Sequence, residues 1–288
     1  MMPLIPSAGT PLRTGDLISA VSGLFKPHFD AYTAALRTYL DASNVTLGNA
    51  GTTAGFITLK ALARRSSRRE VVIPAYTAPS LTLPSRKAGL IPRCCEISLE
   101  TFNMDPARLA ETVGPDTLCV MPVHMFGLAS DINGIQEALE DQEITVVDDA
   151  ASSFGTTVNG RQTGTLGEIG FISFNRGKNM STLVGGAVAT ENDEWFALIE
   201  EERAELPPAD AMFQVRMLVR MMALAVAVRP LGYTALNALI SRYKYTSLHT
   251  DFVSFQFPNV LAGAGVNLIR RADHIAQSRH ENGSLVLD

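Results

Sequence analysis

The chain has 288 residues, of which 46% are hydrophobic and 18% are charged, and this composition excludes an intrinsically disordered protein. The net charge of −5 argues against a dedicated nucleic-acid-binding protein, because such proteins usually carry a basic face. Three cysteines are too few for a disulfide scaffold, and the first residues lack a signal-peptide pattern, so we expect a cytoplasmic protein with reduced thiols.

The middle of the chain alternates short apolar runs with helical patterns. Residues 29–40 carry apolar side chains at helical spacing, and we expect residues 1–44 to form an N-terminal helical segment. The alternation that follows, over residues 45–205, predicts an α/β domain whose mostly parallel sheet is covered by helices on both faces. Seven strands are predicted, at residues 45–48, 71–73, 93–97, 118–123, 144–148, 169–174 and 184–190.

Helices are predicted between the early strands. They span residues 53–65, 79–88, 105–113 and 131–141, and Asp105 and Asp131 can cap the last two. Asn159-Gly160 predicts a tight hairpin turn, and the two strands after it follow one another without a helix, so one of them should run antiparallel. Residues 206–288 are read as a helical segment, with a long helix from about residue 259 toward Arg279.

The most apolar stretch of the chain is residues 217–240. Arg220, Arg229 and Pro230 interrupt it, so it lacks the run of about 18 uncharged residues that a membrane-spanning helix needs. We therefore expect a well-buried pair of helices here and no membrane partner. The same stretch is a candidate for contacts with another subunit or with a further domain.

Polar residues follow three of the predicted strands, where an open α/β sheet binds its ligands. Gly48 to Thr53 form a glycine-containing turn that opens a helix, and Thr52 and Thr53 there suit a phosphate, although a tight helix cap would have the same sequence. The fingerprints G-x-G-x-x-G and G-x-x-x-x-G-K-[ST] are absent, which argues against a nicotinamide-dependent oxidoreductase.

An acidic pair and a lysine follow two further strands. Asp148 and Asp149 end a buried strand, so one either caps the next segment or meets a cationic ligand group. Lys178 is either a solvated surface lysine or a partly buried amine able to form a Schiff base. A phosphate cradle, a carboxylate and an amine together are the set that pyridoxal 5'-phosphate (PLP) requires.

Three motifs in order strengthen this interpretation: D-A-A at 149–151, S-F-x-x-x-K-N at 173–179 and G-G-A-V-x-T at 185–190. With them, the run from VVIPAYT (71–77) onward resembles the DegT/DnrJ/EryC1/StrS family of PLP-dependent sugar aminotransferases. The resemblance implies PLP fold type I and a seven-stranded, mostly parallel sheet. It also implies a homodimer and a C-terminal small domain, before which this chain would end.

The resemblance implies roles for individual residues. Lys178 would form the Schiff base with the cofactor, and Asp149 would pair with the pyridine nitrogen. Ser152 would lie near the ring hydroxyl, where the family usually has Gln or His. The phosphate would be bound by Ser173, Thr52 and Thr53. His124, in a V-H motif, is given a structural or supporting role in preference to direct catalysis.

Two departures from the family pattern concern the site. Ala78 occupies the position of an aromatic residue that stacks on the cofactor ring, so either Tyr76 or Phe154 replaces it or the stacking is lost. In the segment VSFQF (253–257), Ser254 and Gln256 stand where the family has Asn and Arg, which bears on substrate recognition.

The resemblance implies transfer of an amino group from an amino acid, L-glutamate, to a keto-sugar linked to a nucleotide, in nucleotide-sugar and polysaccharide biosynthesis. One alternative is a sugar dehydratase of the same fold, but those enzymes resemble this family with His in place of Lys178. The second alternative is a non-catalytic homologue that serves as a partner or regulatory subunit, which Ala78 would favour.

Overall fold

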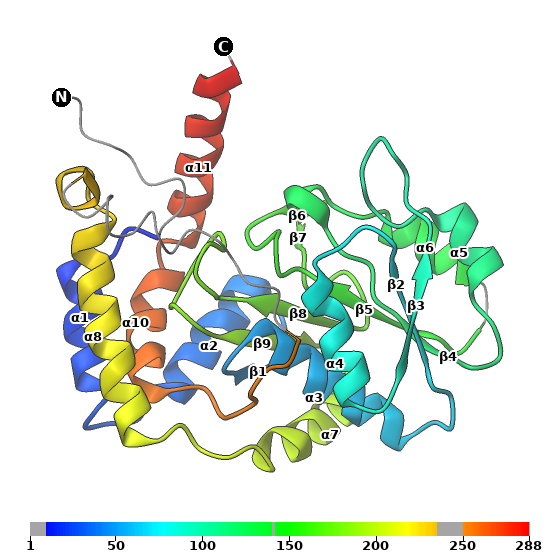
Figure 1. The fold of residues 1–288 in the computed structure, drawn as a ribbon, viewed down its shortest axis with the longest axis horizontal. Helices are drawn as coiled ribbons and strands as arrows, with labels where there is room; N and C mark the ends of the chain where they lie inside the picture. Colours follow the sequence, from blue (N-terminus) through cyan, green and yellow to red (C-terminus); the bar gives the residue numbers. More distant parts are fainter. Residues whose placement is uncertain (1–9, 140–141, 235–249, 288) are drawn as a thin grey trace.

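The computed structural model describes residues 10–139, 142–234 and 250–287 (Figure 1). Seven strands form one sheet in the order β1-β9-β8-β5-β4-β2-β3. In chain order they are β1 (Asn44–Gly48), β2 (Glu70–Pro74), β3 (Ile91–Cys95), β4 (Thr117–Val120), β5 (Thr145–Asp149), β8 (Ile169–Ser173) and β9 (Gly186–Thr190). Each predicted strand is present, so the predicted sheet is confirmed.

One strand runs against the others. β9 pairs antiparallel with both β1 and β8, while the remaining neighbours pair parallel. The predicted hairpin joins the short strands β6 (Thr157–Val158) and β7 (Arg161–Gln162), and Asn159 and Gly160 adopt φ values of 50° and 82° at its turn. Because β1 and β8 point the same way, their carboxyl ends lie at the same edge as that of β5.

Helices cover both faces of the sheet, so the central strands can be apolar on both sides. On one face α3 (Gly51–Arg64), α4 (Thr82–Lys87) and α7 (Asp193–Ala204) pack on a core that includes Val147 and Phe171. Successive strand residues point to opposite faces, so Val146 and Ile172 belong to the cores of the other face. The helices there are α2 (Phe29–Leu40), α5 (Pro106–Thr112), α6 (Ile132–Leu139) and α10 (Asn259–Ile269).

The predicted helix caps are present. The Asp105 carboxylate accepts a hydrogen bond from the Ala107 N–H at the start of α5. The Asp131 carboxylate accepts one from the Gly134 N–H in α6. Over the predicted helix 79–88, a short 3-10 turn, η1 (Pro79–Leu81), precedes α4.

The prediction of one continuous helix from residue 259 is wrong, because two helices are present. α10 ends at Ile269, and α11 (Ala272–Leu287) begins after a break at Arg270 and Arg271. The Arg271 guanidinium donates to the Asp16 carboxylate at 2.5 Å and to the Pro11 carbonyl at 3.3 Å. These contacts tie the break to α1 (Thr14–Ser22).

Two outer helices, α1 and α8 (Ala211–Ala227), lie side by side against α10 (Figure 1). No helix in the described ranges is long and apolar enough to span a membrane. The prediction of a well-buried helix pair is wrong for α8, which is buried on one side only. Met217 and Met221 are buried, whereas Val219 is 54% exposed. Residues 235–240 of that apolar stretch fall in the undescribed gap.

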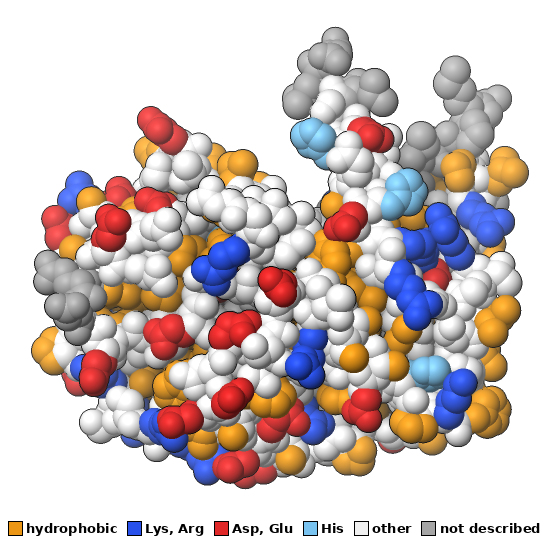
Figure 2. All heavy atoms as spheres, turned by 180° about the vertical axis from the view of Figure 1, so that it is seen from behind, with side chains coloured by type: hydrophobic (Ala, Val, Ile, Leu, Met, Phe, Trp, Pro, Cys, Tyr) orange, Lys and Arg blue, Asp and Glu red, His pale blue; other side chains and the backbone are white. Residues whose placement is uncertain are grey.

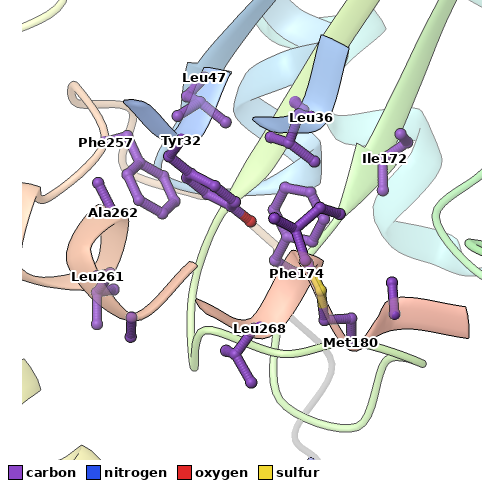
Figure 3. Packing of buried hydrophobic residues seen from close by; sticks show 14 of the residues in the cluster. Tyr32, Leu36, Leu47, Ile172, Phe174, Met180, Phe257, Leu261, Ala262 and Leu268 are labelled. Carbon is purple, nitrogen blue, oxygen red and sulfur yellow. The ribbon is translucent and has the colours of Figure 1, made fainter. Parts of the chain in front are cut away.

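A cluster of aromatic rings joins α2 and the segment before α10 to the end of β8 (Figure 3). The buried ring of Tyr32 in α2 lies 5.9 Å from that of Phe174 and 5.8 Å from that of Phe257. A side chain at Gly265 would come within 2.6 Å of the Tyr32 ring, so α10 can approach α2 only because this residue is glycine. The N-terminal and C-terminal segments thus share one core, while the domain boundaries at residues 44/45 and 205/206 stay predictions.

Gly263→Ala tests the contact between α10 and α1. A Cβ at Gly263 would lie 2.2 Å from the Ser19 carbonyl oxygen, so the helices would have to separate. We expect a loss of about 2 kcal/mol in the free energy of unfolding, measured by urea denaturation. Gly15→Ala in α1 is the control, because a Cβ there meets nothing within 4 Å. Equal stability of the two variants would contradict the tight crossing.

Candidate active site

The start of α3 lies against the end of β8. A Cβ added at Gly51, the first residue of α3, would lie 2.9 Å from Cβ and 3.2 Å from Oγ of Ser173. A Cβ at Gly186 would lie 2.4 Å from the Ala50 carbonyl oxygen. The two glycines therefore let the turn before α3 rest on β8 and β9, with the buried Ser173 hydroxyl beside the helix start.

No described side chain caps the N-terminus of α3, since the residue at the cap is Ala50. The N–H groups of the first turn of such a helix and its positive dipole end form a binding site for an anion. Thr52 is half-buried in this first turn. Thr52 and Ser173, which were predicted to bind the phosphate, therefore both lie at the N-terminus of α3.

Thr53 differs from its neighbour. Its hydroxyl is fully buried and donates to Asn49 Oδ1 at 2.7 Å. The same Asn49 oxygen accepts from the Phe255 N–H at 3.0 Å, and the Asn49 amide donates to the Val253 carbonyl at 2.8 Å. Thr53 and Asn49 thus fasten residues 253–255 to the start of α3.

The segment 253–257 therefore lies beside α3 of its own chain. Ser254 Oγ is 3.4 Å from the Thr53 hydroxyl, and the Gln256 side chain donates to the Leu206 carbonyl at 3.1 Å. Asn49 was not predicted as a site residue. An Asn between a strand-ending glycine and a helix start was the available signal, but its partners lie about 200 residues away in sequence.

Asp148 and Asp149 point to opposite faces of the sheet and have different partners. Asp148 is fully buried and accepts hydrogen bonds from the N–H groups of Gly164 and Leu166 at 2.8 and 2.9 Å. His124 Nδ1 accepts from the Ser130 N–H at 2.8 Å, so Nε2 carries the proton and donates to Asp148. His124 and Asp148 thus form a buried structural pair, as the position of His124 predicted.

Asp149 has fewer partners. It is 5% exposed, and its carboxylate accepts one described hydrogen bond, from the Ala151 N–H at 2.8 Å. Burial raises the pKa of Asp149 to about 6, and the Ala151 N–H and the Lys178 charge only partly offset this effect. A carboxylate this poorly compensated is available to a cationic ligand group.

Lys178 lies in the loop between β8 and β9. Its ammonium donates to Ser152 Oγ at 3.1 Å, and Ser152 follows Asp149 by three residues. Burial lowers the pKa of Lys178, while Asp149 opposes the shift. The structure thus brings Lys178, Ser152 and Asp149 together at the carboxyl edge of the sheet.

Ala78 is exposed and precedes η1. Phe154, one of its two proposed replacements, is 4% exposed and packs against Tyr39 and Phe174 in the core, so it cannot cover a ligand ring. Tyr76, the other, is 48% exposed and lies 5.5 Å from the ring of Phe102. The replacement of Ala78 by Phe154 is therefore wrong.

Comparison with known proteins places the chain in a family. The model of the DegT/DnrJ/EryC1/StrS aminotransferase family matches residues 21–205. The 3-amino-5-hydroxybenzoate synthase of Amycolatopsis mediterranei is 34% identical over 125 residues, which cover 43% of this chain and 32% of that protein. The GDP-perosamine synthase of Caulobacter vibrioides is 31% identical over 163 residues, or 57% of this chain and 44% of that protein. The chain thus spans less than half the length of these two relatives.

Solved structures share the fold over nearly the whole chain. The sugar aminotransferase CalS13 from Micromonospora echinospora superposes with a TM-score of 0.75 at 21% identity, covering 98% of this chain and 72% of that one. The E. coli GDP-4-keto-6-deoxy-D-mannose-3-dehydratase with bound hydrated PLP gives 0.76 at 17% identity, covering 99% and 72%. On the family match over residues 21–205, the chain belongs to the DegT/DnrJ/EryC1/StrS aminotransferase family.

Proposed function

We propose that this chain carries the PLP site of an aminotransferase that moves an amino group from an amino acid to a keto-sugar. The observation that carries the proposal is the partly buried Lys178 amine beside Asp149, at the sheet edge where α3 begins. L-Glutamate as donor, a nucleotide-linked sugar as acceptor and a homodimer belong to the same proposal. The pathway would be polysaccharide biosynthesis, since one relative is the lipopolysaccharide biosynthesis protein RfbH of Salmonella typhimurium.

The residues present fit PLP at its phosphate end. The uncapped first turn of α3 offers N–H groups, and the hydroxyls of Ser173 and Thr52 lie at or beside it. The close packing of Gly51 on Ser173 leaves the helix start free of side-chain bulk. Thr53 would support this turn through Asn49 rather than touch the phosphate.

The residues also fit at the ring end. Asp149 would face the protonated pyridine nitrogen, and a cation there would lower the pKa of this carboxyl group. When bound, PLP supplies an electron sink for the substrate carbon that loses its proton. Lys178 would carry that proton, because burial lowers the pKa of its amine and so favours the neutral form that acts as a base.

Two alternatives have observations behind them. Relatives include a GDP-4-keto-6-deoxy-D-mannose 3-dehydratase of Yersinia pseudotuberculosis, 28% identical over 130 residues. The amine of Lys178 favours the aminotransferase over this reaction. A non-catalytic homologue is favoured by Ala78, which cannot stack on a ring, and the first experiment below separates that case.

Lys178→Ala should abolish covalent capture of PLP and turnover with glutamate. The measurement is PLP titration followed by the visible spectrum, with borohydride reduction and peptide mapping to locate the cofactor. Lys26→Ala is the control, because Lys26 is exposed on the surface. Capture in Lys178→Ala equal to that in the unmodified protein, or PLP spread over surface lysines, would favour the non-catalytic homologue.

Ser173→Ala tests the phosphate end. Loss of one hydrogen bond to an anion should weaken PLP binding about tenfold, as measured by equilibrium dialysis. Thr38→Ala serves as the control, because its exposed hydroxyl donates to the Ala34 carbonyl within α2 and lies outside the start of α3. If both variants bind PLP like the unmodified protein, the phosphate lies elsewhere.

Asp149→Asn should stabilise the protein without PLP at pH 7, by up to about 3 kcal/mol. Because the pKa of Asp149 is raised to about 6, its contribution to stability is present below about pH 4 and is lost as pH rises through 6. The gain in the variant should therefore vanish near pH 4, while PLP binding at pH 7 weakens.

Urea denaturation at both pH values measures this effect. Asp148→Asn is the matched control and should lose stability, because an amide group cannot accept all the bonds from Gly164, Leu166 and His124. A destabilised Asp149→Asn at pH 7 would show that this carboxylate is structural.

A further inference from the structure

The outer side of α8 is apolar although it faces away from the protein. Every third or fourth residue along it is an exposed hydrophobic side chain, and α1 and the turn after it add more. These residues, which we call the α1–α8 face, are Met212, Val215, Val219, Met222 and Val226 in α8, and Ile18, Val21, Leu24 and Phe25 in and after α1. Figure 2, seen from behind, shows orange side chains along the edge of the molecule that these helices form.

This face is distinct from the buried side of the same helix. Met217, Leu218, Met221 and Ala225 pack into the core shared with α10. The outward residues recur at the spacing of one helix face, and Phe25 is 84% exposed. An exposed apolar area of this kind marks a binding surface, since such area is costly to leave in water.

The charges on the face are mainly positive. The charged residues of α8 and the turn after it are Arg216, Arg220 and Arg229, all exposed, and none forms an ion pair with an acid in the described ranges. The sequence has no acidic residue from 211 to 250. Beside α1, Lys26 and Asp30 are exposed, Asp16 is buried against Arg271, and Asp210 is exposed at the N-cap of α8.

The charges distinguish a lipid surface from a second copy of the chain as the occupant of this face. If a second copy packed on this face, the three arginines of one copy would lie near those of the other, with only Asp210 at the start of each α8 to offset them. A lipid surface with anionic headgroups offers the opposite charge and also takes up apolar side chains. We propose that the α1–α8 face docks on membranes that contain anionic lipid, with α8 lying in the plane of the interface.

Such docking differs from spanning a membrane. A helix in the interface buries only its outer side chains among the headgroups, so neither the length of α8, 17 residues, nor the arginines within and after it are an obstacle. The proposal does not depend on PLP or on turnover. Its test can therefore fail without affecting the proposed function.

The experiment is co-sedimentation of the full chain with vesicles of phosphatidylcholine alone or mixed with phosphatidylglycerol. We expect binding to the mixed vesicles that falls with added salt. Arg216→Gln with Arg220→Gln should weaken the partition about fivefold for each arginine, and Val219→Glu with Val226→Glu at least about tenfold. The control, Leu99→Glu with Leu128→Glu, replaces exposed leucines outside this face and should bind unchanged.

Circular dichroism of each variant checks that it is folded, and light scattering measures its mass. Binding that is equal for both kinds of vesicle, or equal for all variants, would overturn the proposal. So would a dimer that Val219→Glu with Val226→Glu turns into a monomer while the unmodified chain ignores both vesicles. That result would make the face a contact between copies of the chain.

Discussion

The close contact between the turn before α3 and the first residue of β9 is the constraint on which the site depends. Gly186 leaves no room for a side chain, because a Cβ would lie 2.6 Å from the Gly51 N–H nitrogen and 2.4 Å from the Ala50 oxygen. This contact holds the start of α3 at the end of β8, where Ser173 lies. An antiparallel β9 is part of the arrangement, since it brings its first residue, not its last, to the carboxyl edge of β1 and β8.

At that edge, two adjacent carboxylates have opposite energetic roles. Asp148 is held by two backbone N–H groups and His124, so its charge is compensated within the protein. Asp149 points to the other face with one such bond, and its raised pKa reflects the missing compensation. Strand alternation thus produces a rigid pair and a poorly compensated acid from neighbouring residues. The buried charge of Asp149 lowers the stability of the protein without a ligand, and a cationic ligand group would restore that stability. Such local losses of stability are common at functional sites.

The sequence predicted what depends on local pattern, and missed what depends on distant contacts. The strands could be predicted because they are apolar runs buried on both faces, and the strand ends pointed to the acidic pair and to Lys178. The choice of Asp149 over Asp148 and the place of Ser152 came from the family resemblance. The hydrogen bond from Thr53 to Asn49 could not be predicted. The Asn49 side chain is also bonded to residues 253–255, which lie about 200 residues away in the sequence. The break before α11 likewise depends on Arg271 reaching Asp16 in α1.

The net charge of the whole chain conceals how charge is distributed along it. Residues 211–250 hold five Lys and Arg and no acid, so the rest of the chain carries a net charge of −10 against the total of −5. A protein that is acidic overall is thus basic along one apolar helix. Near an anionic surface, the acidic remainder would be repelled and the arginines of α8 attracted, so the electrostatic field would orient the molecule with the α1–α8 face toward the lipid. Apolar contact alone would not orient the molecule before it reaches the lipid, because it has no long-range component.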